Sequence, residues 1–268
     1  MGMALRLDDR AVIALTGPET RGFLQGLITN DIEKLAPGVA LYAALLTPQG
    51  KILYDFLLTE GDGAVLIDIA ADSRDALLKR LKMYRLRAQV DIEARDQLVV
   101  MTGLDEPHAR QGVTFDDPRH PGLPRRTLGA RAEMPDAPSQ AAYHALRLEL
   151  GVPEGRDFGV DRMFALDAGL DELHAVSFAK GCYVGQELTA RMKHRGTARK
   201  RLLTIAAEAA LPPPGTALKA AGKEIGEIAS TYGERGFALV RLDRLDEAGS
   251  AVIGAGDVPV RVIKPSWI

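Results

Sequence analysis

The sequence contains a single cysteine, Cys182, in the run KGCYVGQE that spans residues 180–187. A thiol reacts or binds a metal as the thiolate, which a nearby cation or a helix N-terminus favours. Lys180 is a candidate for that cation, and the two glycines of the run allow a tight turn that exposes the sulfur. The alternative is a cysteine buried as a small apolar side chain. We therefore treat Cys182 and Lys180 as candidate catalytic residues.

The residues after Cys182 predict a helix that begins at Gln186, with Glu187 near its start and Lys193 and His194 near its end. This order of charges suits the helix dipole and would place the sulfur near a helix N-terminus. The five histidines of the chain show no spacing that is typical of a metal site. The sequence therefore predicts no stably bound metal from this chain alone.

The motif KGCYVGQE resembles the signature of the YgfZ-type folate-binding proteins. These are bacterial relatives of mitochondrial iron-sulfur cluster assembly factors and are related to the glycine-cleavage T-protein, an aminomethyltransferase. Four further stretches resemble the same family in the same order, at residues 17–32, 47–60, 145–155 and 170–202. The resemblance covers nearly the whole chain and is weakest over 104–138. It implies a tetrahydrofolate-binding protein that helps to assemble or repair iron-sulfur proteins.

On this resemblance the expected ligand is tetrahydrofolate or a derivative, and the expected partners are iron-sulfur assembly proteins and their client enzymes. A cluster needs about four thiolate-type ligands, so Cys182 cannot hold one by itself. Cys182 would act as one ligand of a cluster shared with a partner, or as a redox-active thiol. Such an assembly factor is expected not to be an enzyme.

Candidate residues for binding the pterin ring of folate lie in the predicted helix over residues 139–150. The string ALRLELGVP resembles the T-protein segment whose glutamate contacts the pterin, which implies that role for Glu149, with Arg147 beside it. A carboxylate can accept two parallel hydrogen bonds from the N–H and the amine of a pterin. The alternative is a solvated Glu149 that pairs with Arg147 or another base.

Asp55 lies in the otherwise apolar run over residues 52–58. A carboxylate there has to be paired or to line a pocket, because an unpaired buried charge is costly. In the T-protein the matching stretch carries two adjacent aspartates, and here Tyr54 replaces the first. Asp55 is thus a candidate for the folate site and, in the alternative of a folate-dependent one-carbon transferase or demethylase, for catalysis. Asn30 is a further candidate for a pocket wall, with helix-end capping as its alternative.

Two basic clusters, residues 74–87 and 191–201, stand out in a chain whose net charge is −2. A charge run is usually a solvated face. The second cluster follows the cysteine, so Arg191, together with Tyr183 and Gln186 of the motif, is a candidate for binding folate and its carboxylates. The clusters also leave open an accessory role in tRNA modification. Nucleic acid is disfavoured because aromatic residues, which stack on single strands, make up only 5% of the chain.

The composition is that of an ordinary globular protein, with 46% hydrophobic and 26% charged residues. A lone cysteine fits a reducing compartment. The first nine residues contain no apolar segment of a secretory signal, and no apolar run is long enough to cross a bilayer. From these observations we expect a cytoplasmic protein that does not bind membranes.

The apolar pattern predicts strands that alternate with a few helices, which favours an α+β fold with a mainly antiparallel sheet. The predicted strands lie at residues 3–7, 11–15, 41–46, 52–58, 64–70, 88–94, 97–103 and 175–178, and the predicted helices at 18–30, 72–86, 139–150 and from 186 onward. Six prolines interrupt any pattern between 103 and 138, where we expect loop with a short strand near 125–132.

The sequence changes character after Gly196. Short β-like runs separated by glycines and prolines follow to the end of the chain, which is typical of a small β-barrel. We therefore predict two domains: residues 1–196, a T-protein-like folate-binding α+β domain with flanking helices, and residues 197–268, a C-terminal β-barrel.

Overall fold

The computed structural model describes residues 4–103, 112–134, 140–196 and 199–268. The chain divides into two compact units whose segments alternate along the sequence. The first unit consists of Met1–Leu46, Leu53–Leu146 and Leu173–Val184, and the second of Thr47–Ile52, Arg147–Glu172 and Gly185–Ile268. The division at residue 196 stays a prediction.

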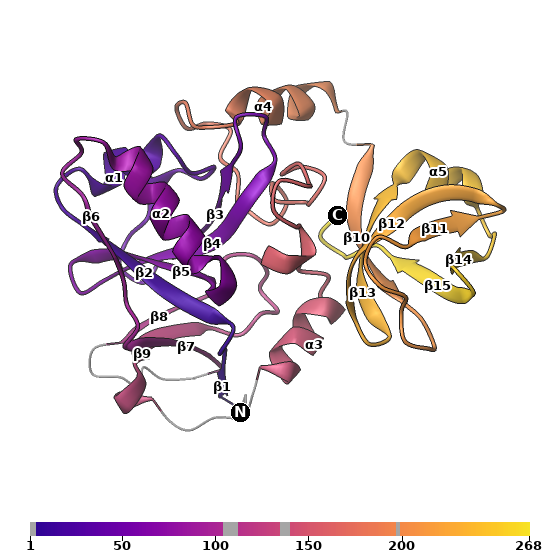
Figure 1. Cartoon of the computed structure of the whole chain (residues 1–268), viewed down its shortest axis with the longest axis horizontal. Helices are drawn as coiled ribbons and strands as arrows, with labels where there is room; N and C mark the ends of the chain where they lie inside the picture. Colours follow the sequence, from indigo (N-terminus) through magenta and orange to yellow (C-terminus); the bar gives the residue numbers. More distant parts are fainter. Residues whose placement is uncertain (1–3, 104–111, 135–139, 197–198) are drawn as a thin grey trace. The chain divides into compact units, whose positions relative to one another are not determined.

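The first unit is built on a five-stranded sheet with the strand order β3-β4-β5-β2-β6 (Figure 1). Its strands are β2 (Arg10–Thr16), β3 (Leu41–Leu46), β4 (Ile52–Gly61), β5 (Ala64–Ala70) and β6 (Asp91–Ala94). β2 pairs antiparallel with β5 and with β6, and β4 pairs antiparallel with β5. The apolar runs of the sequence thus form the strands that they predict.

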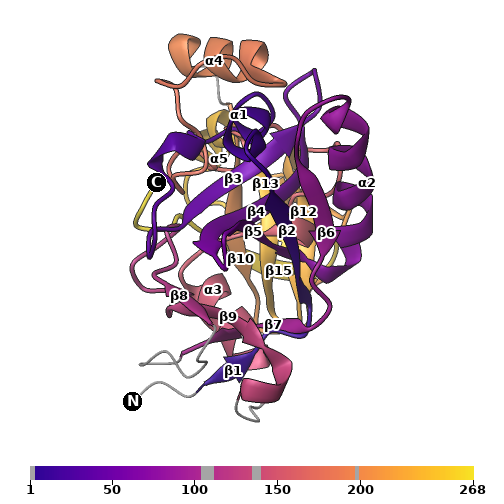
Figure 2. The ribbon, with the colours of Figure 1, turned by 90° about the vertical axis from the view of Figure 1, so that its left-hand side faces the viewer.

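Two helices, α1 (Thr20–Gln25) and α2 (Arg74–Arg85), contribute to the core of this unit. In Figures 1 and 2, α2 lies along the five-stranded sheet. Leu24 and Leu77 are fully buried in one cluster with Ile67 of β5. The helix predicted over 18–30 ends earlier than expected, because Gly26 is its C-cap and Ile28 then forms an isolated bridge with Leu45 of β3.

A second sheet of the first unit has the order β1-β7-β9-β8. It consists of β1 (Leu5–Arg6), β7 (Leu98–Thr102), β8 (Val113–Phe115) and β9 (Arg126–Ala130). β9 confirms the short strand predicted near 125–132. β8 is additional to the prediction: its three residues pair with Arg126–Leu128 of β9, and a run this short carries no readable alternation.

The segment from Ala141 to Arg195 contains two helices, α3 (Ala141–Glu149) and α4 (Gln186–Arg195), joined by a long irregular stretch. Both helices lie within the predicted ranges, and Ser139, where the first of these ranges begins, lies outside the described residues. The strand predicted over 175–178 does not form. Ser177 N–H instead donates to Thr29 O, and the Thr29 hydroxyl donates to Ala175 O. One backbone hydrogen bond and one side-chain hydrogen bond thus hold this stretch in place of the repeated backbone hydrogen bonds of a strand.

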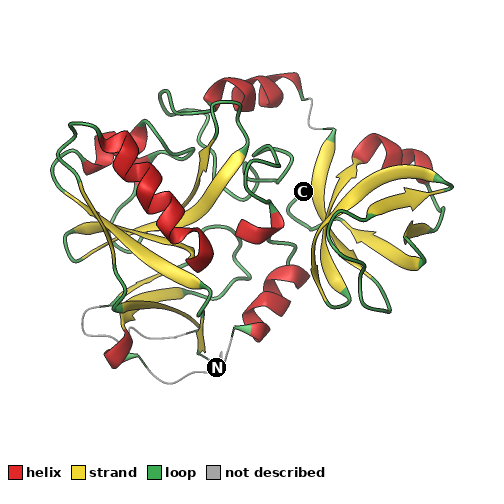
Figure 3. Ribbon diagram, viewed as in Figure 1, coloured by secondary structure: helices red, strands yellow, loops and turns green. Residues whose placement is uncertain are grey.

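The second unit contains a closed six-stranded barrel with the order β10-β13-β12-β11-β14-β15 (Figure 3). Its elements are β10 (Lys200–Ala206), β11 (Ala217–Ala220), β12 (Lys223–Tyr232), β13 (Arg235–Arg241), α5 (Leu242–Ala248), β14 (Ile253–Ala255) and β15 (Val258–Ile263). Alternate residues of these strands, such as Leu203, Ile228 and Val240, form a separate core. The fold is therefore the predicted one, α+β with antiparallel sheets and a C-terminal barrel. None of the described helices is long and apolar enough to cross a membrane.

Candidate functional site

Cys182 lies in an irregular segment just before α4, and its side chain is exposed. Two residues of the same segment are buried: Lys180, two positions earlier, and Tyr183, the next residue, are each only 8% exposed, whereas Gly181 is exposed like Cys182. Gly185 forms the turn into α4 with a φ of 83°, a conformation that glycine adopts without strain. The segment therefore presents the sulfur to solvent between two anchored neighbours, as the flanking glycines predict.

The anchor on the N-terminal side is the Lys180 ammonium group. It donates to three backbone carbonyls, Gln25 O at 2.9 Å, Ile28 O at 2.6 Å and Asn30 O at 2.7 Å. An ammonium group has three hydrogens, so all of them have acceptors in the turn after α1. Burial lowers the pKa of Lys180 from 10.5 to about 8, with a smaller opposing effect of Asp31, so the charged form still predominates at neutral pH. The structure thus gives Lys180 a positioning role.

The same turn is tied to the cysteine segment by Thr29 and Asn30. The Asn30 amide donates to Tyr42 O of β3 and to His174 O, both at 2.8 Å. The Asn30 side-chain oxygen also accepts from the N–H of Asp31, and Asp31 itself is the N-cap of the following 3₁₀ turn. Together with the bonds of Lys180, these hydrogen bonds connect three stretches of the first unit: the turn after α1, strand β3 and residues 174–180, which lead to Cys182.

Asp55 is buried on β4, with 4% exposure, and accepts a hydrogen bond of 2.9 Å from the Tyr42 hydroxyl. The Arg119 guanidinium lies over the Tyr42 ring, 5.6 Å from its centroid. A cation on a ring face is attracted by the ring's quadrupole. Asp55 therefore connects through Tyr42 to a larger set of buried charges.

This set is a network of buried ion pairs that the sequence did not predict. Its members are Arg10 on β2, Asp68 on β5, Asp117 and Arg119 after β8, Arg126 on β9 and Tyr143 on α3. Arg126 is fully buried and joins both acids, at 2.6 Å to Asp68 and 3.0 Å to Asp117. Burial raises the pKa of Asp117, but Arg119 and Arg126 outweigh it and hold that pKa at about 2. The sequence did contain one indication of this network, because Asp68 interrupts an apolar strand just as Asp55 does.

Arg147 and Glu149 of α3 point in different directions. Arg147 is fully buried in the second unit, where it pairs with Asp157 at 2.7 Å and Glu154 at 3.2 Å. It also donates to the Tyr232 hydroxyl and lies 4.9 Å from the Tyr232 ring centroid. Glu149 is exposed. Arg147 is therefore held by two carboxylates inside the second unit, and Glu149, about 200° away around the helix, faces solvent.

The remaining predicted residues lie on or beside α4. Arg191 is exposed and Gln186 is half-buried. Of the basic residues in the second cluster, Lys193 pairs with Asp171 at 2.9 Å and Arg201 pairs with Glu172 at 2.8 Å. This part of the cluster is thus neutralised within the second unit.

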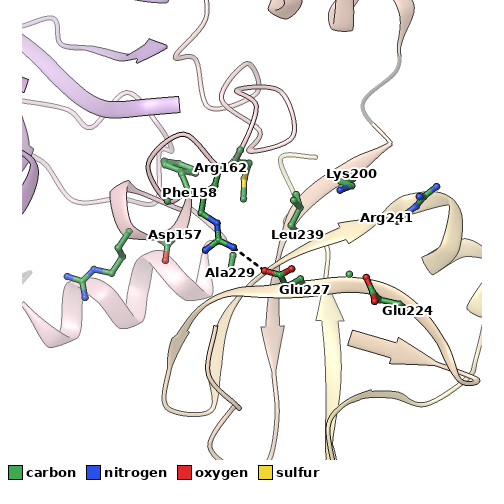
Figure 4. A pocket seen from close by; sticks show the side chains of 13 residues that line it. Asp157, Phe158, Arg162, Lys200, Glu224, Glu227, Ala229, Leu239 and Arg241 are labelled. Carbon is green, nitrogen blue, oxygen red and sulfur yellow. Dashed lines mark hydrogen bonds and ion pairs between the residues drawn. The ribbon is translucent and has the colours of Figure 1, made fainter. Parts of the chain in front are cut away.

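The second unit also contains a cavity of about 280 Å³ between the loop around residues 156–163 and the barrel (Figure 4). Its apolar lining includes Phe158, Met163 and Leu239. Its rim is charged, and Arg162 pairs there with Glu227 at 3.2 Å. None of the residues predicted as sites lines this cavity.

The predicted site residues are divided between the two units. Cys182, Lys180, Asp55, Asn30 and Tyr183 belong to the first, and Glu149, Arg147, Gln186 and Arg191 belong to the second. Within the first unit the structure brings together the cysteine segment, Lys180 and Asn30. The folate site stays a prediction. Arg147, predicted to bind folate, and Lys180, predicted to be catalytic, both donate hydrogen bonds to acceptors within the protein.

Comparison with known proteins agrees with this fold. Residues 199–268 match the family model described as the CAF17 C-terminal β-barrel domain. The solved structure of the glycine cleavage system aminomethyltransferase T from Bartonella henselae superposes with a TM-score of 0.77, covering 100% of this chain and 87% of that one at 17% identity. At this identity the similarity shows the fold alone.

Two curated relatives carry more information. The mouse mitochondrial iron-sulfur cluster assembly factor IBA57 is 31% identical over 98% of this chain and 84% of its own length. The human protein is 32% identical over 90% of this chain and 78% of its own length. Both are named as mitochondrial, which contradicts the cytoplasmic localisation expected above. That expectation was drawn from the composition of the N-terminal residues, which is weaker evidence than the names of relatives this similar. The chain belongs to the IBA57 family of iron-sulfur cluster assembly factors.

Proposed function

We propose that this protein assists iron-sulfur cluster assembly by presenting Cys182 to a partner protein. The relatives are named for that process. The observation that carries the proposal is the exposed thiol on a segment whose neighbours, Lys180 and Tyr183, are buried. A thiol that is accessible yet held in place suits contact with a second protein, because little conformational entropy is lost when it binds.

The chemistry of the site requires that partner. Clusters are held by about four thiolate-type ligands, and this chain has a single cysteine. Cys182 therefore serves either as one ligand of a cluster whose other ligands come from the partner, or as a thiol that forms a transient disulfide with it. Each role depends on the thiolate and on access to the sulfur.

The test replaces Cys182 by serine in cells that depend on this protein. We expect the activities of aconitase and of a radical enzyme with a cluster to fall, while the amount of the variant protein stays normal. Ala179→Ser is the matched control, because Ala179 is also exposed in the same segment and its replacement leaves the thiol in place. Undiminished activities with Cys182→Ser at normal protein levels would exclude the proposal.

Tetrahydrofolate binding is a finer part of the proposal. It is supported by the resemblance of residues 145–153 to the pterin-binding segment of the T-protein and by the exposed carboxylate of Glu149, which is accessible to a ligand. The YgfZ-type assignment, the folate-dependent transferase and the role in tRNA modification also stay predictions. Asp55 would matter to the transferase and Cys182 would not, so turnover of a methylamine donor by Asp55→Asn and Cys182→Ser separates these two functions.

Calorimetric titration with tetrahydrofolate tests the ligand directly. We expect Glu149→Ala to weaken binding about tenfold, or roughly 1.4 kcal/mol. Glu133→Ala is a control, since Glu133 is also exposed but lies outside the segment that resembles the pterin site. Equal affinities of wild type and Glu149→Ala would remove Glu149 from the site, and absence of binding to wild type would remove folate.

A further inference from the structure

The helix α2 has an outer face that is unusual for a solvated helix. Its inner side buries Leu77 and Leu81 in the core of the first unit, and Figure 2 shows the helix at the side of that sheet. The opposite stripe follows the spacing i, i+3, i+4, i+7, which places its members on one face. Its members are Lys79, Lys82, Met83 and Leu86. Met83 is 61% exposed and Leu86 is 86% exposed.

Leu86 is held in a conformation that its side chain does not favour. It is the C-cap of α2, with a φ of 46° and a ψ of −104°. Positive φ at a helix end is typical of glycine, whereas leucine at such a position is strained. Strained residues with exposed side chains are concentrated at functional sites. Folding alone does not account for a leucine here, since its side chain contributes almost nothing to the core.

The charged residues on the outer face of α2 and directly after it are of one sign. Lys79, Lys82 and Arg87 are exposed, and none of them forms an ion pair with a described acid. The only acid of α2, Asp75, pairs with Arg74. A basic surface in a chain of net charge −2 is a local excess that attracts an acidic partner.

We propose that the outer face of α2, formed by Lys79, Lys82, Met83, Leu86 and Arg87, is a docking surface for a protein whose acidic surface surrounds an apolar pocket. Leu86 and Met83 would enter the pocket, and the three bases would pair with carboxylates at its rim. Interfaces combine such central apolar anchors with a polar rim. The two anchors, Met83 and Leu86, are spaced at i and i+3, which places both on one helix face, as in helices that insert into a groove.

Two other classes of partner fit less well. A membrane needs a larger apolar surface, because even a single myristoyl chain binds only marginally and Leu86 with Met83 offers fewer carbons. Single-stranded RNA needs aromatic side chains on which bases stack. The aromatic residue of α2, Tyr84, is half-buried and packs against the core.

The probe is a phage-displayed library of helical peptides with acidic and apolar residues at random positions, selected on the whole folded protein. A selected peptide is then synthesised with a fluorophore, and its affinity is measured by anisotropy at low and high salt. Leu86→Gly removes the anchor and relieves the strain, so this variant folds at least as well as wild type. The double variant Lys79→Glu with Lys82→Glu reverses the charge at two positions around the apolar anchors. The matched controls lie on the barrel: Val252→Ser, which is 77% exposed, and Lys219→Glu with Lys223→Glu.

We expect selected peptides that carry both acids and a large apolar residue. Their affinity should fall about tenfold in Leu86→Gly and in the charge-reversal variant, stay unchanged in the barrel controls, and weaken with salt. Peptides that bind all variants equally would overturn the proposal. So would binding of phosphatidylserine vesicles or of a short single-stranded RNA that depends on Leu86 while no peptide does.

Discussion

At the scale of single residues, Lys180 shows how one side chain positions another. Its three carbonyl acceptors all lie within residues 25–30, so removal of the ammonium group leaves three buried backbone oxygens without their partner. An unsatisfied buried polar group costs about 1–3 kcal/mol. The segment that carries Cys182 therefore depends on Lys180 for its position.

We predict that Lys180→Met lowers the free energy of unfolding by about 2–4 kcal/mol and speeds hydrogen exchange in residues 174–184. Lys34→Met is the control, because Lys34 is exposed and lies at the end of the neighbouring 3₁₀ turn. Urea unfolding and exchange measured by mass spectrometry check both expectations. Unchanged exchange in 174–184 would show that the segment is held by other contacts.

Asp167 gives a pH dependence whose sign follows from its surroundings. Burial raises the pKa of this carboxyl from 3.8 to about 6, and Lys200 and Arg201 oppose the rise. Between pH 4 and pH 6 the Asp167 carboxyl is therefore protonated in the folded protein and ionised in the unfolded chain. Protonation of Asp167 thus stabilises the fold at low pH. This contribution is lost as the pH rises through 6. Asp167→Asn should stay neutral throughout.

We therefore predict that Asp167→Asn is more stable than wild type at pH 7, by up to about 3 kcal/mol, and that the difference shrinks toward pH 4. Asp161→Asn, at an exposed position in the same segment, is the control. Urea unfolding at pH 4.5 and pH 7 provides the comparison. A difference that is constant with pH would mean that Asp167 titrates normally in the folded protein.

At the scale of elements, α3 and the barrel strand β12 are joined by a buried charge cluster. Arg147 pairs with Asp157 and Glu154, while the hydroxyl groups of Ser230 and Tyr232 donate to Asp157. Removal of one partner from a buried pair leaves an uncompensated charge, which costs about 3–5 kcal/mol. We predict a loss of this size for Arg147→Met and almost none for Arg191→Met on the exposed face of α4, measured by urea unfolding. Equal losses would refute a structural role for the cluster.

The same elements show what the sequence could predict. The strands β3 and β4 were predicted from two apolar runs, at residues 41–46 and 52–58, and this signal is local. The burial of Arg147 could not be predicted, because its partners are acids seven and ten residues later and a tyrosine 85 residues later. Likewise, Asp55 was recognised because it interrupts the apolar pattern of its own strand, whereas nothing in the short strand predicted near 125–132 indicated that Arg126 is buried among acids. Local signals found the elements and Cys182, and the partners of buried charges are not local.

At the scale of the whole molecule, each unit has its own apolar core, and the second is organised by the closed barrel. A closed barrel leaves no unpaired strand edge, so each strand is constrained on both sides. Gly236 of β13 lies opposite Thr231 of β12 and Ile205 of β10. A Cβ atom at this position would lie only 2.2 Å from Ser230 O, which is a backbone atom that cannot move without disturbing the ladder.

We predict that Gly236→Ala lowers the free energy of unfolding by about 1–3 kcal/mol, as overpacking does, and that the loss of hydrogen-exchange protection is largest in strands β10, β12 and β13. Gly254→Ala is the matched control in the same barrel, since its Cβ would meet nothing closer than 3.4 Å. Because the first unit has a separate core, amides in β2 and β5 should keep their protection in both variants. Equal effects of the two substitutions would show that β12 can move away from β13 without cost, and that closure of the barrel does not hold the strands in register.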